Sequence, residues 1–190
     1  MKTSLLLLLM IYLNGAQATC DNDVINRIKS FWNGNPPKGS LQKLVGTITW
    51  LTAPSFYVNK SQDIACAQTF IDADGTGRDI VIFIDETVAE NQSYKIAENE
   101  DGVLTFTGDS FSSDEKLHVV YLDNSVLAYY QCQVSGNETY LPFAGVGVVN
   151  AKNNDIDYSP TIIKGLKEAD QALETVKLTP LPGIDTQCGN

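Results

Sequence analysis

Short apolar runs separated by turn residues fill the chain from Leu44 to Asn150. The runs are rich in Val, Ile, Thr, Tyr and Phe, and clusters of Gly, Asn and Asp lie between them. This pattern predicts eight strands: Val45–Tyr57, Asp63–Ile71, Asp79–Glu86, Ser93–Ala97, Val103–Thr107, Lys116–Leu122, Ser125–Val134 and Tyr140–Val149. Most separators are short enough for hairpins, so we expect antiparallel strands joined in order. The fold class is therefore all-β, an eight-stranded up-and-down β-barrel, with a two-sheet sandwich as the open alternative.

Helical periodicity flanks the strand region on both sides. Before it, Asp23 can cap a short N-terminal helix that Gly34 and the following prolines end. After it, Ser159 and Pro160 begin a long C-terminal α-helix. One apolar stripe marks this second helix: Ile162, Leu166, Ala169, Leu173 and Val176. We expect it to pack against the outside of the barrel.

The N-terminus has the pattern of a secretory signal peptide. Lys2 precedes an apolar run from Leu5 to Leu13, and Ala16-Gln17-Ala18 fits a signal-peptidase site. The run is shorter than the roughly 20 residues of a spanning helix, and no later stretch is long enough, so we expect no membrane insertion. We expect residues 1–18 to be removed and residues 19–190 to form a single extracellular domain.

Charge and sequons fit a secreted chain. The net charge is −10, which argues against binding to nucleic acid or to anionic membrane. Asn59, Asn91 and Asn137 begin N-glycosylation sequons and are expected at surface turns. The four cysteines, at positions 20, 66, 132 and 188, predict two disulfides, and spacing alone leaves three connectivities open.

Catalytic and metal-binding patterns are weak. His118 is the single histidine, which excludes three-histidine zinc sites, and no G-x-S-x-G or C-x-x-C motif occurs. The run from Asp72 to Gly77 resembles the start of a calcium loop, but Phe83 holds the position that needs a bidentate Glu. We therefore expect a hairpin turn there, a half-buried His118 satisfied by a neighbour, and neither a metal nor a cofactor. Carboxylates near turns, Glu98 among them, are expected on a solvated rim.

Three stretches resemble motifs of the lipocalin family. Leu44–Trp50 lies where the first strand carries a G-x-W motif, with Gly46 present and Trp50 displaced by two residues. Val119–Cys132 resembles the hairpin between the sixth and seventh strands, with Leu122-Asp123-Asn124 in place of Thr-Asp-Tyr. Val148–Asn153 is similar to the last-strand ending, where Lys152 stands in for the usual Arg. The chain resembles the divergent arthropod branches of the family, such as the bilin-binding, salivary and milk lipocalins, which have apolipoprotein D as a vertebrate relative.

The resemblance implies a disulfide pairing and a function. By position in the family, Cys20 pairs with Cys132 and Cys66 pairs with Cys188. The haem ligand of some salivary members comes from an earlier strand than His118. The isomerase type needs a free thiol, which a fully paired set of cysteines does not supply, so we do not expect an enzyme.

The resemblance predicts a secreted carrier that holds a small, mainly hydrophobic ligand inside the barrel. A salivary-type effector acting through its outer surface on a host protein, or sequestering a biogenic amine or lipid mediator, stays an alternative, as does a nutrient or storage protein. The oligomeric state is left open. Six aromatic residues are candidates for the ligand-lining positions: Trp50, Tyr57, Phe70, Phe83, Tyr121 and Tyr129.

Overall fold

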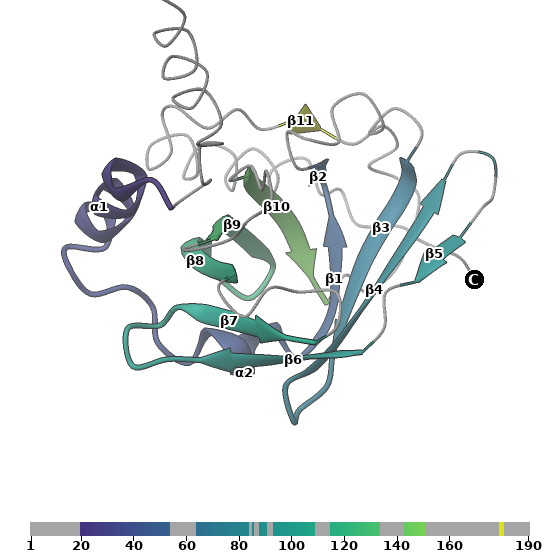
Figure 1. Cartoon of the computed structure of the whole chain (residues 1–190), viewed down its shortest axis with the longest axis horizontal. Coiled ribbons are helices and arrows are strands. Elements are labelled where there is room, and N and C mark those ends of the chain that lie inside the picture. Colours follow the sequence, from purple (N-terminus) through teal and green to yellow (C-terminus); the bar gives the residue numbers. More distant parts are fainter. Residues whose placement is uncertain are drawn as a thin grey trace, which may run out of the picture.

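The computed structural model describes residues 20–53, 64–83, 85, 88–90, 93–108, 115–133, 143–150 and 179–180 (Figure 1). The helices there are α1 (Asn22–Phe31) and α2 (Ser40–Leu44). The strands are β1 (Gly46–Trp50), β2 (Thr52–Ala53), β3 (Ile64–Ile71), β4 (Thr76–Phe83), β5 (Val88–Glu90), β6 (Tyr94–Glu98), β7 (Leu104–Thr107), β8 (Glu115–Leu122), β9 (Val126–Gln133), β10 (Phe143–Val149) and β11 (Thr179–Pro180). The predicted signal peptide, the asparagines of the three sequons and the predicted C-terminal helix lie outside the described residues.

The main sheet closes on itself. Its strand order is β3-β1-β10-β9-β8-β7-β6-β4, and the pairing of β3 with β4 joins the two ends of this row. All neighbouring strands in the ring run antiparallel. Each of the eight strands pairs with the one that follows it along the chain, and the last, β10, pairs with the first, β1. The eight-stranded up-and-down barrel predicted from the sequence is confirmed, and the sandwich is excluded. Outside the ring, β5 extends from β4, and β2 pairs with β11.

Closure divides the apolar side chains into two groups. The inner cluster lies inside the barrel: Leu44, Ile48, Ile71, Tyr94, Ile96, Leu104, Phe106, Leu117, Val119, Leu122, Leu127, Tyr129 and Val149. The outer cluster lies between the barrel wall and α1: Val24, Ile28, Leu51, Val120, Val126, Ala128, Tyr130, Cys132, Ala144, Val146 and Val148. Strand residues alternate between the two groups, as they must in a closed sheet.

Helix α1 packs on the outside of β8 (Figure 1). Its N-cap is Asp21, whose carboxylate accepts hydrogen bonds from the backbone N–H groups of Asp23 and Val24. The prediction that Asp23 is the cap was wrong, because Asp23 already lies in the first turn, where its charge favours the helix dipole. At the other end the indole N–H of Trp32 donates to the Val119 carbonyl at 3.2 Å. None of the helices among these residues is long and apolar enough to span a membrane.

A disulfide ties the N-terminal segment to the barrel. Cys20 and Cys132 are bonded, with their Cα atoms 5.0 Å apart, which confirms the pairing implied by the family resemblance. Cys66 is disulfide-bonded as well. Its expected partner, Cys188, lies outside the described residues, so the second pairing stays a prediction.

At one end of the barrel, hydrogen bonds of the Asn150 side chain connect β1 with the end of β10. The side chain of Asn150 accepts a hydrogen bond from the Thr47 N–H and donates one to the Val45 carbonyl. Gly46 has φ +121°, and any Cβ there would overlap the Asn150 amide, so only glycine fits. Asn150 thus joins the first and last strands of the ring. Lys152, the predicted counterpart of the usual arginine, lies outside the described residues.

The short helix α2 covers this same end, beside β6 (Figure 1). It was missed in the sequence because five residues show too little periodicity. Glu98, expected on a solvated rim, holds it instead: its carboxylate accepts from the N–H groups of Gly39 and Leu41 at 2.7 and 2.9 Å. Leu44 of α2 is then buried in the inner cluster.

Replacing both Cys20 and Cys132 with Ala should lower the free energy of unfolding. The bond joins residues 112 positions apart, and the chain-entropy model assigns about 4–5 kcal/mol to such a loop. Urea unfolding followed by circular dichroism measures the difference from wild type. A loss below about 1 kcal/mol would show that α1 and its packing hold this segment without the bond.

Candidate functional site

Polar side chains occur on the inner face of the barrel, where apolar ones would pack most easily. Thr69 on β3 and Asp79 on β4 lie in phase with inward-facing neighbours, Ile71 and Val81 respectively. Tyr94 on β6 belongs to the inner cluster and is 4% exposed. Because burying polar groups is costly unless they are hydrogen-bonded, their bonding pattern defines the candidate site.

These residues form a continuous hydrogen-bonded chain across four strands. The indole N–H of Trp50, on β1, donates to Thr69 Oγ1 at 2.9 Å. The Thr69 hydroxyl donates in turn to Asp79 Oδ1 at 2.6 Å, and the Tyr94 hydroxyl donates to the same oxygen at 2.7 Å. Both donors are neutral hydroxyl groups, and both bonds end on the same oxygen of Asp79.

The environment keeps Tyr94 protonated. Burial raises the pKa of the Tyr94 hydroxyl well above its usual range, and the negative charge of Asp79 adds to the effect. Tyr94 therefore stays a hydrogen-bond donor at every pH at which the protein is expected to work.

Aromatic rings cover glycines on the neighbouring strand β10. Gly147 pairs with Trp50, and a Cβ at Gly147 would lie 2.6 Å from Ile48 Cγ2 and 2.9 Å from the indole. Gly145 pairs with Tyr129, and a Cβ there would overlap the Tyr129 ring. The two rings touch edge to face, with centroids 5.1 Å apart. The inner surface of β10 is thus lined by Trp50 and Tyr129.

A second polar group lies on β8 and β9. Leu122 and Leu127, beside the hairpin that joins these strands, belong to the inner cluster, but farther along the inner face becomes polar. There Gln131 Nε2 donates to Glu115 Oε2 at 3.0 Å, and Gln133 pairs across from Glu115. All three are at least nine-tenths buried. Among the residues that the structure describes, Asp79 and Glu115 thus place carboxylates on two different walls of the interior.

The structure places three of the six aromatic candidates inside the barrel. Trp50 and Tyr129 belong to the site just described, and Phe83 packs with Trp50, Ile64 and Val81. Tyr57 lies outside the described residues.

The other two candidates lie on the outer side. Phe70 faces away from Thr69 and Ile71, with the Arg78 guanidinium 5.0 Å from its ring centre. Tyr121 packs against the outer cluster because a β-bulge between Val119 and Tyr121 shifts the alternation by one residue. Neither residue is brought to the site.

Sequence reasoning missed the polar members of the interior: Thr69, Asp79, Tyr94, Glu115, Gln131 and Gln133. The alternation of residues along the strands could have identified two of them. Asp79 is two residues from Val81 and four from Phe83, so these three side chains share one face of β4. Gln131 shares a face of β9 with Tyr129 and Leu127 in the same way. Polar residues in the inward phase of an apolar strand are unusual enough to mark a site.

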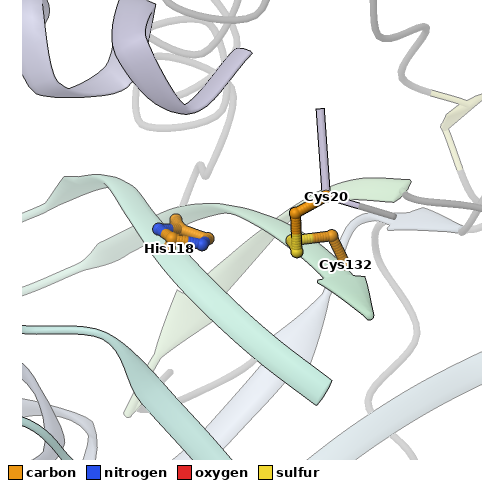
Figure 2. Close-up of side chains that lie close together, drawn as sticks. All are labelled: Cys20, His118 and Cys132. Carbon is orange, nitrogen blue, oxygen red and sulfur yellow. A yellow bond between two sulfur atoms is a disulfide. The ribbon is translucent and has the colours of Figure 1, made fainter. Parts of the chain in front are cut away.

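His118 lies on the outer face of β8, close to the Cys20–Cys132 disulfide (Figure 2). Its Nε2 is buried and has no hydrogen-bond partner, so the expectation of a histidine satisfied by a neighbour was wrong for this atom. The ring lies 6.3 Å from that of Tyr130. The ligand atoms of Cys20, His118 and Cys132 lie within 4.8 Å of one another. Because both sulfur atoms are in the disulfide, neither is available as a thiolate ligand.

Comparisons with known proteins identify the fold. A scan against models of known protein families found no match, and no curated protein matches the chain by sequence. Among solved structures, lobster apocrustacyanin A1 gives a TM-score of 0.52 at 14% identity, covering 90% of this chain and 94% of its own. Apocrustacyanin C2 gives 0.51 at 16% identity, covering 87% and 90%. These are lipocalins, and the closed barrel described above is the lipocalin fold.

Replacing Gly147 with Ala should disturb the aromatic pair. The added methyl group meets Ile48 and Trp50, so we expect a loss of about 1–3 kcal/mol and a shift in Trp50 emission. The measurement is urea unfolding and tryptophan fluorescence in a Trp32→Phe background, where Trp50 is the sole indole. Unchanged emission would mean that Trp50 does not rest on Gly147.

Acid should destabilise the protein through His118. Burial, followed by the nearby charges of Lys116 and Lys29, lowers the pKa of His118 from 6.5 to about 4. Between these values the unfolded chain binds a proton that the folded one does not, so stability falls as pH falls through this window. The effect is roughly 3 kcal/mol at most.

The measurement is the free energy of unfolding at pH 7 and pH 4 for wild type and for His118→Phe. Wild type should lose more stability than the variant over this interval. Equal losses in the two proteins would contradict the assignment to His118.

Proposed function

We propose that the protein is a secreted carrier, which binds a small, mainly hydrophobic molecule inside its barrel and releases it unchanged. The inner face supports this proposal: its walls are apolar and aromatic, and its few polar groups are gathered on particular strands. Ligand sites have this composition, with apolar walls for affinity and a few polar groups for orientation. Eight-stranded barrels of this kind have room for one small ligand.

A role without catalysis is supported by the state of the cysteines. Cys20, Cys66 and Cys132 are all disulfide-bonded, so none of these described cysteines supplies a thiol nucleophile. Secretion is proposed from residues 1–18 and from the sequons at Asn59, Asn91 and Asn137. The disulfides support it, since such bonds persist in oxidising compartments. We propose one mature domain over residues 19–190.

The proposal predicts stoichiometric binding of a neutral apolar probe. N-phenyl-1-naphthylamine should bind in a 1:1 ratio and accept energy from Trp50, because Trp50 lies on the inner wall. Titration of the purified Trp32→Phe variant, in which Trp50 is the sole indole, with excitation of tryptophan, measures both effects. No saturable binding would contradict the carrier role.

Two neighbouring residues on β8 provide a matched pair of variants. Leu117 faces inward and Lys116 faces outward. Leu117→Trp should fill part of the interior and weaken probe binding about tenfold or more, whereas Lys116→Trp should leave it nearly unchanged. Circular dichroism and urea unfolding check that both variants are folded. Equal effects of the two variants would place the probe outside the barrel.

A further inference from the structure

Three potential metal ligands meet on the outer side of the barrel, beside α1: Cys20, His118 and Cys132 (Figure 2). One ligand atom from each of these residues lies within 4.8 Å of the other two. The disulfide occupies both sulfur atoms in the oxidised protein. Its reduction would leave two thiols and an imidazole together. Zn²⁺ accepts this set of three protein ligands and keeps its fourth position open.

The His118 ring is the second observation that points to an ion. Its Nε2 atom is buried, and no hydrogen-bond partner for it occurs among the residues that the structure describes. A buried nitrogen without a partner costs stability, because it has lost its hydrogen bonds with water. Histidine is the commonest metal ligand in proteins. Metal binding by this ring would explain why an imidazole lies where the described part of the fold leaves one of its nitrogen atoms unbonded.

The fold holds the Cys20 segment in place by contacts other than the disulfide. The backbone N–H of Asp21 donates to the Tyr130 hydroxyl at 3.2 Å. Farther along the segment, Val24 and Ile28 of α1 are buried in the outer cluster. A reduced chain therefore keeps the Cys20 thiol next to the barrel wall, where the other two ligands lie.

The positions of the ligands suit a single ion. Cys132 lies opposite Lys116 in the pairing of β9 with β8, and His118 is two residues farther along, on the same face. The Cα atoms of Cys20 and Cys132 are 5.0 Å apart. Two thiolates bound to one Zn²⁺ at about 2.3 Å lie roughly 3.8 Å from each other. Rotation of the two cysteine side chains reaches this spacing with the backbone in place.

We propose that reduction of the Cys20–Cys132 disulfide by a dithiol creates a site in which the two thiolates and the His118 imidazole bind one Zn²⁺ ion, with water in the fourth position. The dithiol gives up two electrons and two protons and becomes a cyclic disulfide, while the two cysteines become thiols. Zn²⁺ then displaces the two thiol protons, which pass to solvent. The ion takes over the link between the N-terminal segment and the barrel. The site lies outside the barrel interior, so its failure would leave the carrier role untouched.

Cobalt(II) tests the site, because it takes the place of zinc and, unlike zinc, absorbs visible light. The wild-type protein is reduced with dithiothreitol, freed of the reagent without air, and titrated with Co²⁺. One equivalent should give a thiolate-to-cobalt charge-transfer band and the strong visible bands of tetrahedral Co²⁺, and Zn²⁺ should abolish both. The oxidised protein should give neither. A reduced protein without these bands would overturn the proposal.

Substitutions assign the bands to these residues. His118→Phe should weaken Co²⁺ binding about tenfold or more, because one of three protein ligands is lost. His118→Cys should keep the ion and strengthen the charge-transfer band, because a third thiolate replaces the imidazole. The matched control, Cys66→Ser combined with Cys188→Ser, removes the other two thiols and should bind as wild type does.

Two further outcomes would contradict the assignment. Equal affinities of wild type and His118→Phe would exclude the imidazole as a ligand. Loss of the bands in the control that lacks Cys66 and Cys188 would move the ion to that pair. Circular dichroism of each reduced protein checks its fold. A reduced wild type that unfolds, and that Zn²⁺ does not refold, would also overturn the proposal, since the ligands would no longer be held together.

Discussion

The closure of the sheet through the pairing of β3 with β4 determines where every other side chain lies. An open sheet would leave two unpaired edges, whereas the closed ring has an inside and an outside. Strand alternation then sends each residue to one or the other, which yields the inner cluster and the outer cluster. Asn150 and Gly46 fix the first strand against the last, and the Cys20–Cys132 bond fixes α1 over the outer wall.

The polar interior follows from the same constraint. In a closed barrel, a polar residue in the inward phase cannot reach bulk water through the wall, so it must find partners inside. Asp79 finds Thr69 and Tyr94, and Glu115 finds Gln131. Such residues still stabilise the fold less than apolar ones would, so their presence calls for an advantage other than stability. The proposed function, in which these residues orient a ligand, supplies that advantage.

Much of the fold could be predicted from the sequence, and the site could be predicted only in part. The eight strands and their order follow from period-two alternation and turn residues, which are local signals. Tyr121 was a candidate for the ligand-lining positions, and no local signal announces the bulge that turns it outward. Trp50 and Tyr129 were candidates for the ligand-lining positions, and both rings lie inside the barrel. Their packing against Gly147 and Gly145 depends on pairing between distant strands, which the sequence does not show. The helix α2 depends on Glu98, which lies more than fifty residues away.

The central claim is that the interior of this barrel holds a ligand in the protein's natural setting. Native mass spectrometry of the protein from its natural source, after removal of glycans, tests it most directly. The account predicts one added mass of roughly a few hundred daltons per chain, carried by a mainly hydrophobic molecule. A bare polypeptide mass that stays unchanged after exposure to apolar amines and lipids would contradict it.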